Sequence, residues 1–193
     1  MATRTDDPIA SIAAQVGRRL SEHRRDRHLS LGDLARQTGL SKTALASLER
    51  GTGNPSLETL WRIAHALDSS VGELLEDPEA PTSRKLGADE GPVVVSSSGM
   101  RGRLLGADDS RHRTEVFELS LPAGSRFESE PHPVGTRELV VCTRGTVAVG
   151  PVDEPLRLGP ADSATFPGST PHVYAGVRRG GTAVLVMSYP PHA

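Results

Sequence analysis

The sequence is poor in aromatic residues and in cysteine. Aromatic residues make up 3% of the chain, so its cores must be built mainly from Leu, Val, Ile and Ala. The single cysteine, Cys142, excludes an intrachain disulfide. No apolar run reaches membrane-spanning length, and the first residues lack the apolar core of a secretory signal. We therefore expect a cytoplasmic protein.

Charge is nearly balanced over the 193 residues but is unevenly placed. The formal net charge is −2, yet the segment from Pro8 to Leu67 carries nine basic and five acidic residues, which leaves the remainder net negative. A basic segment on an otherwise acidic chain is a modest nucleic-acid signal.

The texture of the sequence changes near residue 77. Before it, apolar residues recur at helical spacing and predict five helices, the first of which carries Ile9, Ile12, Val16 and Leu20 on one face. After residue 92, short Val-, Leu- and Thr-rich runs separated by Gly and Pro predict the strands of a sandwich or barrel. The clearest runs are Val93–Val95, Glu115–Leu119, Leu139–Cys142, Thr146–Val149, Ala164–Phe166 and Ala183–Met187.

Between these regions, the segment from Pro78 to Pro92 has almost no apolar content and several breakers, which is typical of a linker. The sequence therefore predicts two domains: an all-α domain over residues 8–77, a linker over 78–92, and an all-β domain over 93–193.

The stretch from Leu31 to Arg50 has the spacing of two helices that cross steeply. Ala35 is small enough for the crossing, and Gly39 can adopt the left-handed conformation of the turn. Ser41 can cap the next helix, as Ser30 and Ser56 can cap their own. Leu45 and Leu48 would then anchor that helix and leave its polar residues exposed.

This region resembles the XRE-type, lambda-repressor-like helix-turn-helix proteins. The resemblance runs from about Ile12 to Leu75, with motif matches at residues 34–41, 48–51, 54–60 and 66–75. It implies a DNA-binding domain whose third helix enters the major groove. By position it assigns base contacts to Lys42, Thr43 and Ser47, and phosphate contacts to Ser30, Arg50 and Asn54. The alternative is a helical protein-docking domain with the same core.

The same family often pairs an arginine of the first helix with a glutamate near the end of the third. Arg24 and Glu49 occupy those positions. Such a pair would hold the reading helix at a fixed angle, whereas two independent surface charges would contribute little.

From about Arg113 onward the chain resembles a cupin, a small antiparallel barrel. The matching residues of the first motif are Gly124, His132, Glu138 and Gly145, and those of the second are Gly159, Asp162, Pro167 and His172. Gly176 stands where the second motif usually ends in Asn.

Metal-binding cupins use three histidines and one carboxylate, and here Val134 takes the place of the second histidine. The resemblance implies that His132, Glu138 and His172 line a pocket for an effector, a divalent transition metal, or both. Val134 is expected to form an apolar wall of that pocket. The alternative is that both histidines are hydrogen-bonded barrel residues.

Four further residues are expected to lie outside the functional sites. Cys142, Trp61 and Tyr174 are interpreted as packing residues. Strand alternation predicts that Tyr174, like Arg137, points out of the barrel.

The two resemblances together imply a transcription regulator that binds double-stranded DNA as a homodimer and responds to a small-molecule effector, with no membrane partner and no enzymatic activity. Two alternatives stay open at this point. In the first, the barrel is itself a cupin dioxygenase or isomerase, and the DNA-binding domain only localises it. In the second, the protein is a constitutive repressor whose barrel only dimerises.

Overall fold

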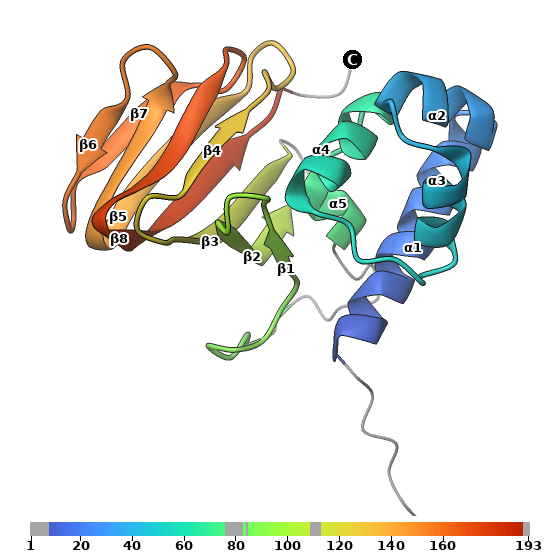
Figure 1. Cartoon of the computed structure of the whole chain (residues 1–193), viewed down its shortest axis with the longest axis horizontal. Coiled ribbons are helices and arrows are strands. Elements are labelled where there is room, and N and C mark those ends of the chain that lie inside the picture. Colours follow the sequence, from blue (N-terminus) through green and yellow to red (C-terminus); the bar gives the residue numbers. More distant parts are fainter. Residues whose placement is uncertain (1–7, 76–82, 84, 109–112, 191–193) are drawn as a thin grey trace, which may run out of the picture. The chain divides into compact units, whose positions relative to one another are not determined.

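The computed structural model describes residues 8–75, 83, 85–108 and 113–190, with side chains described from residue 12 onward (Figure 1). The chain divides into two compact units, Met1–Arg84 and Lys85–Ala193. The first is helical and the second is an antiparallel β structure, so the predicted fold class is confirmed. No described helix is long and apolar enough to cross a membrane.

The described part of the helical unit contains five helices, and serines begin three of them. The side chains of Ser30, Ser41 and Ser56 accept hydrogen bonds from backbone N–H groups in the first turns of α2, α3 and α4. The three predicted caps are thereby confirmed. The helices are α1 (Pro8–Asp26), α2 (Leu31–Thr38), α3 (Lys42–Glu49), α4 (Leu57–Ala66) and α5 (Val71–Leu75).

Glycines fix the position of α3 against its neighbours. Gly39 has a φ of 69°, so the predicted left-handed turn between α2 and α3 is confirmed. On α1, a Cβ atom at Gly17 would lie 2.5 Å from the Leu48 carbonyl oxygen. Only glycine allows α1 to pass this close to the end of α3. Leu20, Leu45 and Leu48 close the core between them.

The β unit is built around two long strands, β5 (Arg137–Pro151) and β8 (His172–Ser188), which pair with each other along most of their length. Register shifts in β5 near Arg144 and Gly145 bend the pair, so each strand contributes to two faces of the barrel. The shorter strands are β1 (Val93–Val95), β2 (Arg101–Asp108), β3 (Thr114–Leu121), β4 (Arg126–Ser129), β6 (Leu156–Leu158) and β7 (Ser163–Pro167).

The bend in the β5–β8 pair produces two sheets. Their inward side chains meet in the barrel interior. The C-terminal half of β8 and the N-terminal half of β5 lie between β3 and β7. The N-terminal half of β8 and the C-terminal half of β5 lie between β4 and β6. Residues at the start of β5 and the start of β8 therefore face one another across the interior.

Part of the predicted linker packs against strand β2. The Arg103 guanidinium donates hydrogen bonds to the carbonyl oxygens of Gly87 and Glu90. The second compact unit accordingly begins at Lys85. Residues 78–82 and 84 of the predicted linker lie outside the described residues, as does the side chain of Ile9. The domain bounds stay predictions.

Candidate functional sites

The predicted DNA contacts lie at the start of α3 and in the segment that follows it. Lys42 and Thr43 occupy the first turn of α3 and are exposed, as is Asn54 in the loop before α4. Ser47 is half-buried, and its hydroxyl accepts a hydrogen bond of 3.1 Å from the exposed Arg50 guanidinium. These side chains can reach a partner without rearrangement of the core.

Ser30 lies apart from this group, at the start of α2. Its hydroxyl donates to Asp33 Oδ2 at 2.5 Å and accepts from the Asp33 backbone N–H, forming a capping box. The Ser30 hydroxyl proton is thus already committed to Asp33. That hydrogen bond holds the pKa of Asp33 below its usual value. Nearby, a Cβ atom at Gly32 would lie 3.2 Å from Lys42 Cε, so the absence of a side chain there leaves space for Lys42.

Arg24 and Glu49 form a two-pronged ion pair between α1 and α3. Arg24 Nε donates to Glu49 Oε1 at 2.6 Å and Nη2 donates to Oε2 at 3.1 Å. A third donor, Nη1, reaches the Leu29 carbonyl oxygen at 2.7 Å. The exposed fractions of the Arg24 and Glu49 side chains are 13% and 12%. The pair is well shielded from water and joins α3 to α1.

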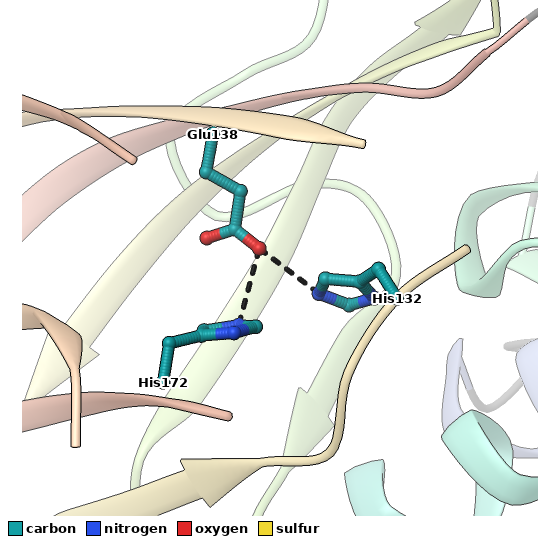
Figure 2. Close-up of side chains that lie close together, drawn as sticks. All are labelled: His132, Glu138 and His172. Atoms are coloured by element: carbon teal, nitrogen blue, oxygen red, sulfur yellow. Dashed lines mark ion pairs between the residues drawn. The ribbon is translucent and has the colours of Figure 1, made fainter. Parts of the chain in front are cut away.

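In the β unit, three distant residues converge inside the barrel: His132 from the loop before β5, Glu138 from β5 and His172 from β8 (Figure 2). We call them the interior triad. Glu138 Oε1 lies 2.9 Å from His132 Nε2 and 3.1 Å from His172 Nε2. One ligand atom from each residue lies within 4.8 Å of the others, and all three residues are buried.

The hydrogen bonding of His172 leaves one of its nitrogens turned toward the carboxylate. Its Nδ1 lies 2.7 Å from the Thr170 carbonyl oxygen, which can only accept, so Nδ1 carries a proton. In the neutral ring, Nε2 then presents a lone pair. Nε2 and Glu138 Oε1 both lack an aligned hydrogen-bond partner, although they lie close together. Two acceptors facing each other require a proton or a cation between them.

The ionisation of the triad follows from this arrangement. Burial would raise the pKa of Glu138, but the imidazoles of His132 and His172 outweigh burial and lower it to about 2. Burial would likewise lower the pKa of His172, but the Glu138 carboxylate raises it above the usual value. The carboxylate is therefore ionised inside the barrel and attracts positive charge.

Gly168 forms one side of the triad site. A Cβ atom there would lie 2.9 Å from His132 Cδ2 and 3.0 Å from Glu138 Oε1, closer than side chains normally pack. The backbone of residue 168 can therefore lie this close to His132 and Glu138 only because the residue is glycine. Two imidazole nitrogens and a carboxylate oxygen that converge within 4.8 Å suit a divalent transition metal.

Tyr174 belongs to the site, so the expectation that it points outward is wrong. It is 3% exposed, and its hydroxyl donates a short hydrogen bond to Glu138 Oε2. The reason is simple strand geometry: residues two apart share a face, so the inward His172 carries Tyr174 inward with it. That signal was present in the sequence. Burial, and then the Glu138 charge, raise the pKa of Tyr174 well above its usual value.

Val134 does not line the barrel, which corrects the predicted apolar wall. Its side chain is 88% exposed, in a turn closed by a 3.0 Å hydrogen bond from Thr136 N to the Pro133 carbonyl oxygen. Gly135, with a φ of 96°, helps the chain to turn before β5 begins. Aromatic side chains lie next to the triad instead: the Phe166 ring lies 5.6 Å from that of His172, and Tyr189, 6.2 Å from His132, donates to the buried Glu115 at 3.1 Å.

The remaining sequence expectations concern single residues. Arg137 is exposed, and Cys142 is fully buried, as expected for an outward and a packing residue. Trp61 is half-buried on α4, and its ring stacks on His65 at 6.0 Å. Gly176 is required by close packing, since a Cβ atom there would lie 2.0 Å from the Pro122 carbonyl oxygen.

Comparison with known proteins agrees with this architecture. A family model described as Helix-turn-helix matches residues 20–74. The regulator SutR of Escherichia coli (strain K12) is 28% identical over 173 residues, covering 90% of this chain and 92% of SutR. The uncharacterized regulator y4dJ of Sinorhizobium fredii (strain NBRC 101917 / NGR234) is 38% identical over 60 residues, covering 31% of this chain and 78% of y4dJ.

A solved structure extends the similarity to both units. The crystal structure of an HTH_3 family transcriptional regulator from Vibrio cholerae has a TM-score of 0.70 and 25% identity, covering 94% of this chain and 99% of that one. Together with the helix-turn-helix and the bent antiparallel barrel, these similarities define a class of two-domain DNA-binding proteins. The chain belongs to the XRE-type helix-turn-helix transcriptional regulators, and its second domain is an antiparallel β barrel.

Proposed function

We propose that this regulator reads a specific DNA sequence with α3 and adjusts that binding to a small-molecule effector held in the barrel. The observation that carries the proposal is the interior triad, in which an ionised carboxylate and a histidine nitrogen face each other without an aligned partner. A proton on His172 supplies the positive charge that this arrangement requires, and a bound cation can take the place of that proton because both atoms are ligands for a transition metal.

The triad would hold a divalent transition metal through His132, Glu138 and His172. When bound, the metal would supply a positive charge and open coordination positions to an effector carrying oxygen or nitrogen groups. The chain contributes the anionic carboxylate, the fixed imidazole orientation of His172, and shielding of all three side chains from water. We propose binding without turnover; oxygen consumption by the metal-loaded protein would instead favour the dioxygenase alternative.

We further propose that the protein acts as a homodimer on a nearly palindromic site. One helix-turn-helix contacts only a few base pairs, so useful affinity requires two heads at a fixed spacing. Sedimentation of the full chain with and without operator DNA measures this directly. A monomer in both conditions would contradict the proposal.

The DNA-reading half is tested with two variants of the exposed surface. Lys42→Ala is expected to lower affinity for the selected sequence by about 10- to 100-fold and to affect non-specific DNA much less, because Lys42 is placed to contact bases. Arg50→Ala should weaken both and reduce the salt slope by about 1. An unchanged sequence preference in Lys42→Ala would show that α3 is not the reading helix.

The sensing half is tested with a double variant, His132→Ala with His172→Ala. A thermal-shift screen of the metal-supplemented wild type first identifies an effector, and fluorescence anisotropy then measures its influence on DNA affinity. We expect the double variant to lose that influence and to keep ligand-free DNA binding. A full response in a folded double variant would place the sensing site elsewhere.

A further inference from the structure

The two oxygens of the Glu138 carboxylate have different environments. Oε1 faces both histidine nitrogens of the interior triad, at 2.9 and 3.1 Å. Oε2 points away from them and accepts the hydrogen bond of the Tyr174 hydroxyl. Glu138 and Tyr174 are 0% and 3% exposed, so water does not compete for either group.

We propose that Tyr174 is a positioning residue, which holds the Glu138 carboxylate so that Oε1 alone is presented to a divalent metal. The inference rests on the proposed metal site. A carboxylate can otherwise rotate or offer both oxygens to a cation, because its torsion is soft. The phenolic hydrogen bond occupies Oε2 and removes that freedom.

The neighbours of Tyr174 make the hydrogen bond specific. Its ring packs edge-on against His172, with centroids 5.5 Å apart, and lies 6.3 Å from the Phe127 ring. Register places Phe127 directly opposite Tyr174 in the β4–β8 pair. Packing between β4 and β8 therefore fixes the direction of the Tyr174 hydroxyl. The Tyr174 side chain contacts two members of the triad, Glu138 and His172.

The barrel supplies a matched control for this contact. Tyr189 is also buried, and its hydroxyl donates to a buried carboxylate, Glu115, at 3.1 Å. Glu115 is not a member of the triad. Tyr189→Phe therefore removes the same chemical group from an equally buried tyrosine–carboxylate pair and leaves the proposed metal ligands in place.

The experiment compares Co²⁺ binding by full-length wild type, Tyr174→Phe and Tyr189→Phe, using chelator competition and the visible absorption of bound Co²⁺. We expect Tyr174→Phe to bind Co²⁺ about 10- to 100-fold more weakly, the usual effect of losing a group that orients a ligand. Its absorption band should also change in position or intensity, because Oε2 becomes free. Tyr189→Phe should match wild type in both measurements.

Each outcome decides the inference. Equal loss in both variants, or wild-type binding and absorption in Tyr174→Phe, overturns the positioning role while the metal site stands. No Co²⁺ binding by wild type overturns the proposed metal site and this inference together.

If Tyr174→Phe does not fold, a second measurement uses the native side chain. The chain has two tyrosines, so 3-fluorotyrosine incorporated into Tyr189→Phe labels Tyr174 alone. A Co²⁺ band that shifts on fluorination supports the inference, and an unchanged band overturns it.

Discussion

The helical unit and the barrel expose their candidate functional groups in opposite ways. In the helical unit, Lys42, Thr43 and Asn54 are exposed and come from a short continuous stretch of chain. In the barrel, the interior triad is at most 5% exposed and is contributed by residues 132 to 172. Water satisfies the first set when no partner is bound, whereas only the protein or a ligand can satisfy the second.

This difference determines how strongly the residues of each site depend on one another. An exposed side chain such as that of Lys42 can be removed with little effect on its neighbours, so the effects of such substitutions should be nearly additive. A buried ionised group such as Glu138 is stabilised only by what surrounds it. Changes around the triad should therefore alter ligand binding and barrel stability together.

The largest effect is expected from Gly168→Ala, which alters no proposed ligand. The added methyl group would displace His132 and Glu138, whose atoms lie 2.9 and 3.0 Å from its position. We expect Co²⁺ affinity to fall about 100-fold and the barrel to lose about 1–3 kcal/mol of unfolding free energy. Metal titration and denaturant unfolding measure the two quantities.

The control for this change is Gly106→Ala. Gly106 lies in β2, and no atom stands within 4 Å of its would-be Cβ atom. It should bind Co²⁺ as the wild type does. Wild-type metal affinity in Gly168→Ala would mean that His132 and Glu138 are not the residues that hold the metal.

The features that the sequence predicts differ between the two units, because those of the helical unit arise within a few residues and those of the barrel do not. The caps at Ser30 and Ser41 and the turn at Gly39 act within a few residues, so local patterns predict them. The three cupin motif residues His132, Glu138 and His172 were found by resemblance and do meet inside the barrel. Their separation along the chain means that no local pattern could have brought them together.

The sequence predictions depart from the structure where strand register or a turn sets the position of a residue. The two predicted runs 139–142 and 146–149 are parts of one strand, β5, which continues through Gly145 and the register shifts around it. The turn before β5 sends Val134 outward, which the motif alignment did not reveal. Strands β2, β4 and β6 were not among the clearest predicted runs, because β-strand signals depend on packing across the sheet.

In the helical unit, an effect on stability alone, without the change in metal affinity expected of Gly168→Ala, is expected from Arg24→Ala. The substitution leaves the shielded Glu49 carboxylate and the Leu29 carbonyl oxygen without their donors, which should cost about 2–4 kcal/mol of unfolding free energy. Trp61, the only tryptophan, lies in α4, so its fluorescence should report unfolding of this unit separately from the barrel.

Arg36→Ala is the matched control, because Arg36 also pairs with a carboxylate but its side chain is 79% exposed. Its cost should stay within about 1 kcal/mol. Equal losses of unfolding free energy in Arg24→Ala and Arg36→Ala would show that the Arg24–Glu49 pair behaves as an ordinary surface contact. Shielded and exposed charges would then contribute equally to the stability of this unit.

The smallest effect is expected at Val134, where the sequence and the structure disagree most. Its side chain is 88% exposed, so Val134→Ala should change Co²⁺ affinity by less than about twofold, in line with other exposed substitutions. Val134→His should not add a ligand either, although metal-binding cupins have a histidine at this motif position. A tighter Co²⁺ complex in Val134→His, seen by chelator competition, would mean that the turn before β5 rearranges to bring residue 134 into the barrel.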